Sequence, residues 1–216
     1  MDIAQIVTVL GVILVSMMLH ELAHGFVALK LGDETARLLG RLSFNPLKHV
    51  DPFLTVMLPL LIVVTNSLAG ANMPIFGGAK PVPINPNNVR SEWGVALIAI
   101  SGPLINLVLA FISYGLFILG GGASSTAIGA VLSTSVVVNL GFFAFNILPI
   151  PPLDGSRVLY ALAPEIVRKG MDAIERYGAV FVFAIVLLFN DVLFQYMALL
   201  INAILAIFAG IFGIQA

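Results

Sequence analysis

The sequence predicts an all-α integral membrane protein: a bundle of five or six transmembrane helices with a short interfacial β-like hairpin and a possible re-entrant segment. Of its 216 residues, 60% are hydrophobic and 10% are charged, whereas soluble domains carry about 25% charged residues. No Asp, Glu, Lys or Arg occurs in residues 93–153, which is enough chain for two spans of about 20 residues each. A soluble enzyme, a nucleic-acid-binding module and a disordered scaffold are therefore excluded.

The charge balance and the cysteine content limit the binding partners and the metal ligands that this sequence predicts. The chain has 10 basic and 11 acidic residues and a net charge of −1, so no polybasic patch predicts binding to nucleic acid or recruitment by anionic lipid. The expected surroundings are the lipid bilayer, with no nucleic-acid partner. The chain has no cysteine, so any metal must be held by His, Asp or Glu.

The first half of the chain contains one clear span and three less regular regions. Residues 3–29 form an apolar run without the basic start or small-residue cleavage site of a signal peptide, which predicts a retained span. Within the polar region that follows, residues 38–44 alternate like a strand and predict an interfacial hairpin or loop. Residues 52–79 are uncharged but contain prolines, glycines and asparagines, so they are either a poor span or a re-entrant segment. Three prolines in residues 80–88 predict an ordered, non-helical loop.

The second half contains the stronger spans. Residues 94–119 and 126–148 predict two spans joined by a tight, uncharged hairpin. Prolines at positions 149, 151 and 152 stop the second of them. Residues 164–176 alternate charged and apolar side chains like an interfacial helix. Two closing spans are expected at residues 177–190 and 192–212, with a turn at Asn190-Asp191.

Residues 20–24 read His-Glu-Leu-Ala-His inside the first predicted span. In a helix, His20 and His24 lie one turn apart on the same face, where both imidazoles can bind one Zn²⁺, and Glu21 lies beside them to deprotonate water. Each ionisable side chain at membrane depth costs about 3 kcal/mol or more, and such residues usually have a function. The alternative is a hydrogen-bonded polar cluster that packs helices together.

A catalytic zinc usually has three protein ligands and one open position. The other histidine, His49, lies in the polar loop at an unrelated spacing and is expected to be a solvated or hydrogen-bonded loop residue. The better candidate is Asp154, the first charge after the long neutral stretch, in the segment Asn-Ile-Leu-Pro-Ile-Pro-Pro-Leu-Asp-Gly of residues 146–155. The alternative role of Asp154 is to cap the next short helix.

Together these motifs resemble the site-2 protease family of intramembrane zinc metalloproteases, peptidase family M50. That family pairs H-E-x-x-H on one transmembrane helix with N-x-x-P-x-P-x-x-D-G at the end of another, and residues 20–24 and 146–155 match both patterns without a gap. Residues 101–106, Ser-Gly-Pro-Leu-Ile-Asn, and residues 78–86, Gly-Ala-Lys-Pro-Val-Pro-Ile-Asn-Pro, look like the compact subgroup without a PDZ domain. The predicted closing spans carry no signature of the family.

The resemblance implies a zinc metalloendopeptidase that cleaves within or near transmembrane segments of other membrane proteins, in regulated intramembrane proteolysis. It implies one Zn²⁺ per chain, held by His20, His24 and Asp154. It further implies that Glu21 is the general base and that the amides of Asn146 and Asn106 hold the substrate or the tetrahedral intermediate. The whole chain, 1–216, would form a single transmembrane peptidase domain with a catalytic core at about 3–158 and closing helices at about 164–214.

Two other readings of the metal motif remain open at the level of sequence. A membrane metal-ion transporter would distribute ionisable residues along a path and often shows a repeat, whereas here they gather at one depth. An inactive relative acting as a scaffold would not need Glu21 to bind metal. Residues 38–44 and 80–88 are either places where an extended substrate adds as a strand or rigid connectors.

The metal site also predicts a topology. His20 and His24 lie about 26 Å along the first span, near its C-terminal end, and Asp154 lies just beyond the end of another span, so both helices must end on the same side of the membrane. This requires an odd number of crossings between them, so the segment that contains Pro59 should enter and return without crossing, which leaves five spans. That topology places all 10 basic residues on the side of the metal site, as the positive-inside rule favours. We expect this to be the cytoplasmic face of a cell or inner membrane. The N-terminus and the Asn190-Asp191 turn would lie outside and the C-terminus inside.

Overall fold

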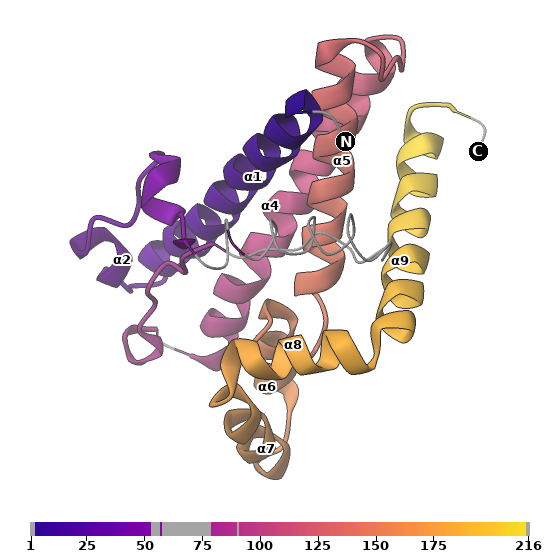
Figure 1. Ribbon diagram of the computed structural model, residues 1–216. Helices are drawn as coiled ribbons and strands as arrows, with labels where there is room; N and C mark the ends of the chain where they lie inside the picture. The colour runs from indigo at the N-terminus through magenta and orange to yellow at the C-terminus, as the bar shows by residue number, and fades with distance from the viewer. Residues whose placement is uncertain (1–2, 53–56, 58–78, 90, 215–216) are drawn as a thin grey trace.

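The computed structural model describes residues 3–52, 57, 79–89 and 91–214 (Figure 1). Helices account for most of these residues, and the described part of the chain contains no strand. The elements in chain order are α1 Ile3–Lys30, α2 Thr35–Leu38, η1 Pro46–His49, η3 Pro86–Asn88, α4 Glu92–Leu119, α5 Ala127–Asn146, α6 Asp154–Leu162, α7 Glu165–Glu175, α8 Gly178–Leu188 and α9 Asn190–Ile211.

Local sequence signals set the ends of α4 and α5. The Ser91 side chain accepts a hydrogen bond from Gly94 N at 3.2 Å, and the Thr126 side chain accepts one from Gly129 N at 3.0 Å, so each hydroxyl satisfies an otherwise unpaired helix N–H. Between the two helices the chain turns through Gly121 and Gly122, whose φ angles are +89° and +66°. Glycine adopts this conformation without a steric penalty, so the hairpin is tight and the two helices run antiparallel.

Helices α1, α4 and α5 form the core of the bundle (Figure 1). Near the C-terminal end of α1, Ala28 packs against Val89 and Ile98, at the start of α4. The stretch between α1 and α4 therefore begins and ends at the same end of the bundle. The predicted re-entrant segment at residues 52–79 lies almost entirely outside the described residues.

The described residues hold four helices that are long and apolar enough to cross a membrane: Ile3–Lys30, Trp93–Leu119, Ala127–Asn146 and Asn190–Ile211. The prediction of a span at residues 177–190 is not confirmed. Helix α8 has 11 residues, which is about 16 Å of helix against the roughly 30 Å of a bilayer core. Figure 1 shows it lying across the lower end of the bundle, with α9 rising from it.

The direction of α9 changes the expected position of the C-terminus. Phe208 of α9 packs with Ala110 of α4 in one buried cluster, and the Phe212 ring lies against Gly115, near the end of α4. The C-terminal end of α9 thus lies beside the α4–α5 hairpin, at the end of the bundle where α1 begins (Figure 1). The structure thus puts both ends of the described chain at one end of the bundle, whereas the sequence predicts them on opposite sides of the membrane.

The predicted β-like hairpin at residues 38–44 is also absent. Leu38 closes the short helix α2, and the chain then turns at Gly40, whose φ is +64°. The guanidinium of Arg41 donates to the carbonyl oxygens of Lys80 and Pro81 at 2.9 and 3.2 Å. A side chain, rather than a ladder of backbone hydrogen bonds, therefore joins this region to the proline-rich loop.

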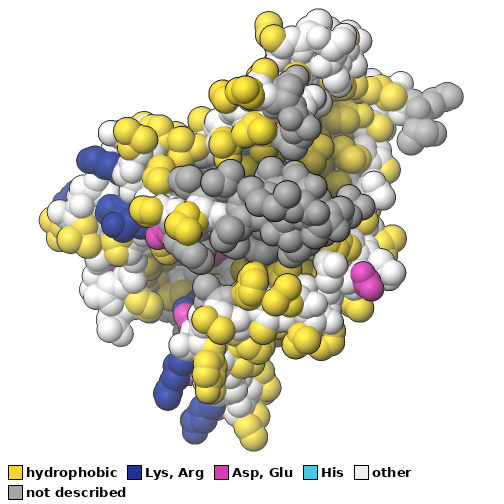
Figure 2. Space-filling model, viewed as in Figure 1, with side chains coloured by type: hydrophobic (Ala, Val, Ile, Leu, Met, Phe, Trp, Pro, Cys, Tyr) yellow, Lys and Arg dark blue, Asp and Glu magenta, His cyan; other side chains and the backbone are white. Residues whose placement is uncertain are grey.

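Basic side chains gather at one end of the molecule. In Figure 2 the Lys and Arg side chains appear near α2 and η1 and at α7, and none appears over the upper ends of α4, α5 and α9. On the face shown, this is the distribution that the positive-inside rule favours.

Candidate metal centre

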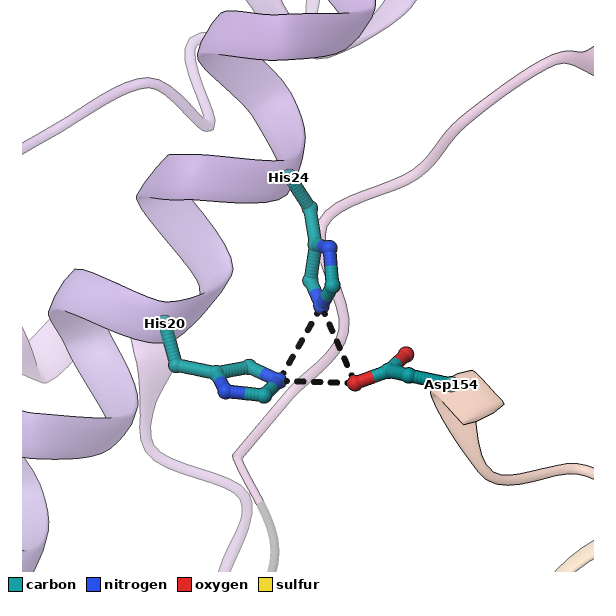
Figure 3. Close-up of side chains that lie close together, drawn as sticks. All are labelled: His20, His24 and Asp154. Carbon is teal, nitrogen blue, oxygen red and sulfur yellow. Dashed lines mark hydrogen bonds and ion pairs between the residues drawn. The ribbon is translucent and has the colours of Figure 1, made fainter. Parts of the chain in front are cut away.

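Helix α1 presents His20 and His24 one turn apart toward the interior of the bundle (Figure 3). The two Nε2 atoms are 3.0 Å apart, and the rings meet edge to face, with their centroids 4.6 Å apart. Both side chains are buried, at 9% and 6% exposure. The four-residue spacing on one helix therefore produces the paired imidazoles that it predicts.

Asp154 arrives from another part of the chain, at the first residue of α6. Its Oδ2 atom lies 3.1 Å from His20 Nε2 and 3.4 Å from His24 Nε2. The next residue must be glycine, because a Cβ at Gly155 would stand 2.1 Å from the carbonyl oxygen of Ile147. The tight turn after α5 thus brings this carboxylate to the histidines.

The hydrogen-bond partners of the two imidazoles suit this group of three side chains to a cation. His24 Nδ1 lies 2.7 Å from the carbonyl oxygen of Ile98, which can only accept, and His20 Nδ1 lies 2.5 Å from Asn106 Oδ1. A neutral imidazole has one N–H, so both Nε2 atoms present lone pairs. Asp154 Oδ2 is buried without a hydrogen bond. Three ligand atoms within 4.8 Å of one another fit Zn²⁺, which takes nitrogen and oxygen ligands.

Glycine is required at the floor of this site. A Cβ built on Gly102 of α4 would stand 2.4 Å from His24 Nε2 and 2.6 Å from His20 Nε2. The segment around Gly102 matches a family motif, but nothing in the sequence alone assigns a role to the glycine. The structure gives it one, because only a residue without a side chain leaves room for the ligand nitrogens.

Glu21 lies beside the histidines and is held by the proline-rich loop. Its Oε2 atom accepts a hydrogen bond of 2.7 Å from the backbone N–H of Val82. Val82 lies between Pro81 and Pro83, which have no N–H, so it supplies the only backbone donor of these three residues. Lys80 N donates in turn to His49 O at 2.9 Å. Several backbone groups that an added substrate strand would need are therefore already engaged, which favours the rigid-connector interpretation of this loop.

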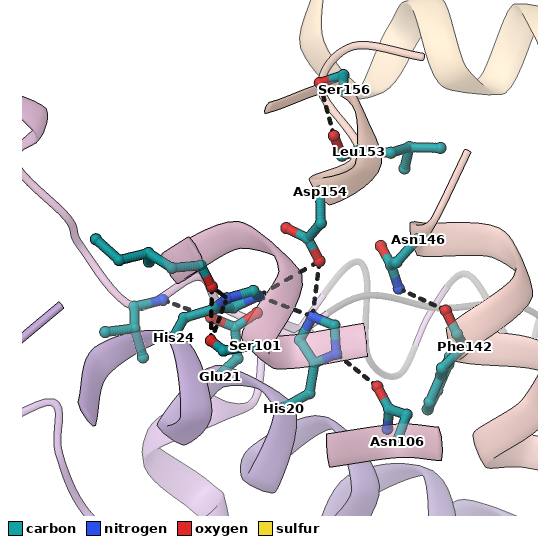
Figure 4. Close-up of polar contacts among 12 residues, drawn as sticks. His20, Glu21, His24, Ser101, Asn106, Phe142, Asn146, Leu153, Asp154 and Ser156 are labelled. Atoms are coloured by element: carbon teal, nitrogen blue, oxygen red, sulfur yellow. Dashed lines mark hydrogen bonds and ion pairs between the residues drawn. The ribbon is translucent and has the colours of Figure 1, made fainter. Parts of the chain in front are cut away.

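An apolar cavity of about 850 Å³ opens beside the site, lined by residues of α1, α5, α8 and α9. His20, Glu21 and Asn146 form part of its wall, and Figure 4 shows them with Asp154 around one space. Asn146 Nδ2 donates to the carbonyl oxygen of Phe142 at 3.0 Å. A primary amide has two N–H donors. This hydrogen bond uses one of them, and the second N–H can donate to another group.

Two residues considered for the site from the sequence, Asn106 and His49, do not line the cavity. Asn106 is fully buried and lies behind His20, bonded to the ring and to Asn139, so its contacts are with the ligand and not with the cavity. His49 is buried at 1% exposure, and its Nε2 lies 2.8 Å from Ser43 O. It is separate from the His20, His24 and Asp154 group and joins two parts of the connecting loop.

The protein thus combines apolar helices long enough to cross a membrane with a group of two histidines and a carboxylate that could hold a metal ion. The comparisons give the family: the chain belongs to peptidase family M50, which it matches over residues 8–130 and 121–189. The resemblance seen in the motifs is therefore confirmed.

Curated relatives carry metalloprotease names. The chain is 41% identical over 174 residues to "Putative zinc metalloprotease YwhC" of Bacillus subtilis, covering 77% of this chain and 74% of that protein. It is 31% identical to "Putative zinc metalloprotease Rip2" of Mycolicibacterium smegmatis, over 83% of this chain and 66% of that protein. Rip2 of Mycobacterium tuberculosis is 28% identical over 81% and 64%. No solved structure matches the chain.

Proposed function

We propose that this protein is an intramembrane zinc metalloprotease of the site-2 type, which hydrolyses peptide bonds within or near transmembrane segments of other membrane proteins. The observation that supports this most directly is the position of the candidate metal centre. His20, His24 and Asp154 converge inside a bundle of helices apolar enough to span a membrane, and Glu21 lies beside them on the wall of an apolar cavity. A transporter has no need of a base placed beside the metal ligands.

His20, His24 and Asp154 would hold one Zn²⁺ per chain. When bound, zinc polarises the scissile carbonyl and lowers the pKa of water to about 7. Glu21 removes the proton from the attacking water and delivers it to the leaving amine. Its Oε2 atom is held by the N–H of Val82, which leaves the other carboxylate oxygen to carry the proton.

Substrate binding is assigned to the cavity and to Asn146. A transmembrane helix satisfies its backbone N–H and C=O groups internally, so the substrate must unwind before its scissile carbonyl can be attacked. The second N–H of Asn146 can then donate to the carbonyl oxygen of the opened segment. The apolar side chains of the cavity wall, such as Phe142 and Leu193, suit the hydrophobic side chains of that segment.

The test is cleavage of single-span membrane proteins by the purified protein, with and without a zinc chelator. We expect chelation to abolish cleavage and zinc to restore it.

Glu21→Gln should abolish cleavage while one zinc stays bound, because the amide cannot act as a base and the ligands are unchanged. Asp154→Ala should lower zinc content sharply, because it removes one of three ligands. Cleavage that survives Glu21→Gln, or normal zinc content in Asp154→Ala, would contradict these roles.

A further inference from the structure

A chain of buried amides leads from His20 into the α4–α5 interface. His20 Nδ1 lies 2.5 Å from Asn106 Oδ1, Asn106 Nδ2 donates to Asn139 Oδ1 at 2.9 Å, and Asn139 Nδ2 donates to Ser135 O at 2.9 Å. Asn106 and Asn139 are 0% and 1% exposed. They lie in apolar helices, where an unsatisfied amide is costly, so the bonds are expected to persist.

The last acceptor in this series of hydrogen bonds, Ser135 O, fixes the direction of every hydrogen bond before it. Ser135 O is a backbone carbonyl and can only accept, so Asn139 must present its NH₂ group to it and its Oδ1 to Asn106. Asn106 must then present its NH₂ group to Asn139 and its Oδ1 to His20. His20 Nδ1 therefore carries the proton, and the lone pair of Nε2 faces Asp154.

The two histidines differ in the acceptor that keeps the proton on Nδ1. His24 Nδ1 meets the carbonyl oxygen of Ile98 directly, and no side-chain substitution can remove that acceptor. For His20 the acceptor is an amide that could rotate by 180° and present its NH₂ group instead. The contact with Asn139 is what prevents this rotation.

We propose that Asn139 is a positioning residue of the metal centre: it holds the Asn106 amide in the orientation that keeps His20 Nε2 unprotonated and available to zinc. Asn139 touches neither the ligand atoms nor the cavity wall, and it acts through Asn106. Substitution of a residue that orients a ligating histidine typically lowers metal affinity about 10- to 100-fold. This inference depends on zinc binding by His20, which is part of the proposed function.

The test compares Asn139→Leu with Asn139→Asp, measuring zinc affinity by competition with a chelator and thermal unfolding of the metal-free protein. Leucine has a similar size and suits an apolar bundle, but it cannot accept from Asn106. Aspartate keeps an acceptor for Asn106 Nδ2 whether or not it is protonated. We expect Asn139→Leu to bind zinc about 10-fold or more weakly and Asn139→Asp to stay near wild type. A role in packing alone predicts the opposite order, so that order would overturn the proposal.

A matched control lies in the same interface. Ser113 Oγ and Ser135 Oγ are 2.8 Å apart, and Ser135 Oγ also accepts from Asn139 Nδ2 at 3.2 Å, so replacing Ser113 removes a contact between α4 and α5 but leaves both Ser135 acceptors of Asn139 in place. Ser113→Ala should leave zinc affinity unchanged. If Asn139→Leu does not fold, Asn139→Ala replaces it: alanine also lacks an acceptor for Asn106 Nδ2 and should weaken zinc binding in the same way, whereas wild-type affinity in Asn139→Ala would overturn the proposal. Wild-type protein that binds no zinc would refute the proposed function, whereas equal binding by wild type and Asn139→Leu would refute this inference alone.

Discussion

At the scale of single residues, the candidate metal centre depends on side chains that would contribute a ligand atom and on a glycine that leaves room for them. His20, His24 and Asp154 supply lone pairs, whereas Gly102 supplies room, since its missing Cβ would lie 2.4 to 2.6 Å from the two ligand nitrogens. Glycine inside a helix costs about 0.5–1 kcal/mol relative to alanine. Its presence within α4 is therefore explained by the site and not by the stability of the helix.

We expect Gly102→Ala to lower zinc affinity by about 10-fold or more, because the added methyl group must push both imidazoles away from Asp154. Zinc content after dialysis against a chelator series measures this. Gly11→Ala is the control: it changes another helical glycine whose Cβ position meets nothing within 4 Å, and it should keep wild-type affinity. Equal affinities of the two variants would show that the imidazoles are not confined by α4.

Val82 offers a second test at the residue scale. Val82→Pro removes the N–H that holds Glu21 and should lower kcat about 10- to 100-fold, the loss typical of a misplaced catalytic group, while zinc content stays normal. Val82→Ala keeps the N–H and should show a smaller loss. The readout is kcat for cleavage together with zinc content, and a larger loss in Val82→Ala than in Val82→Pro would rule out the assigned role of this hydrogen bond.

At the scale of elements, Asp33 joins the two halves of the connection between α1 and α4. It is fully buried, and its carboxylate accepts hydrogen bonds from Thr35, from Asn85 N at 2.7 Å and from Asn88 Nδ2 at 2.9 Å. Burial alone would raise the pKa of Asp33, but these donors outweigh it and hold the pKa below its usual value of 3.8. The proline-rich loop that holds Glu21 is thus fixed in place by an ionised carboxylate.

A lowered pKa means that the Asp33 contacts contribute stability above about pH 4 and lose it as the pH falls through the native pKa. We expect the thermal unfolding temperature of the detergent-solubilised protein to be lower in Asp33→Asn than in wild type at pH 7, because the amide turns an NH₂ group toward donors. The difference should shrink below about pH 4. The neighbouring Glu34→Gln, which breaks only an exposed ion pair with Arg37, should change stability by about 0–1 kcal/mol. A difference independent of pH would contradict the assignment.

At the scale of the whole molecule, the four candidate spans place both chain ends at one end of the bundle and the metal centre toward the other. His24 contacts Ile98 near the start of α4, and Phe212 of α9 contacts Gly115 near its end. We propose that the end with the metal centre faces the cytoplasm, because the basic side chains gather there.

Single cysteines can test this topology because the chain has none. Lys30→Cys and Asp191→Cys should react with an impermeant thiol reagent from one side of the membrane, and Ser124→Cys and Ile214→Cys from the other. The cysteine-free wild type gives the background. Reaction of Asp191→Cys and Ser124→Cys from the same side would mean that the segment containing α8 crosses after all, and would restore a fifth span.

The sequence by itself determined the membrane class, the first span and the candidate metal ligands. These depend on local properties: hydropathy reports whether a segment can lie in lipid, and a four-residue spacing places His20 and His24 on one helix face whatever surrounds it. Asp154 is the third candidate because it is the first charge after a long neutral stretch, and the match of residues 146–155 to a family pattern favours a ligand over a helix cap.

Only the tertiary structure decided the direction of α8 and the contacts that support the metal centre. An apolar run such as residues 177–190 records that a segment avoids water, but hydropathy is the same for a helix that crosses the bilayer and for one that lies across the end of a bundle. The contacts of Gly102, Val82 and Asn139 join elements far apart in the chain. They exist because α1, α4, α5 and the proline-rich loop pack closely enough for a group on one of them to lie against a candidate site residue on another.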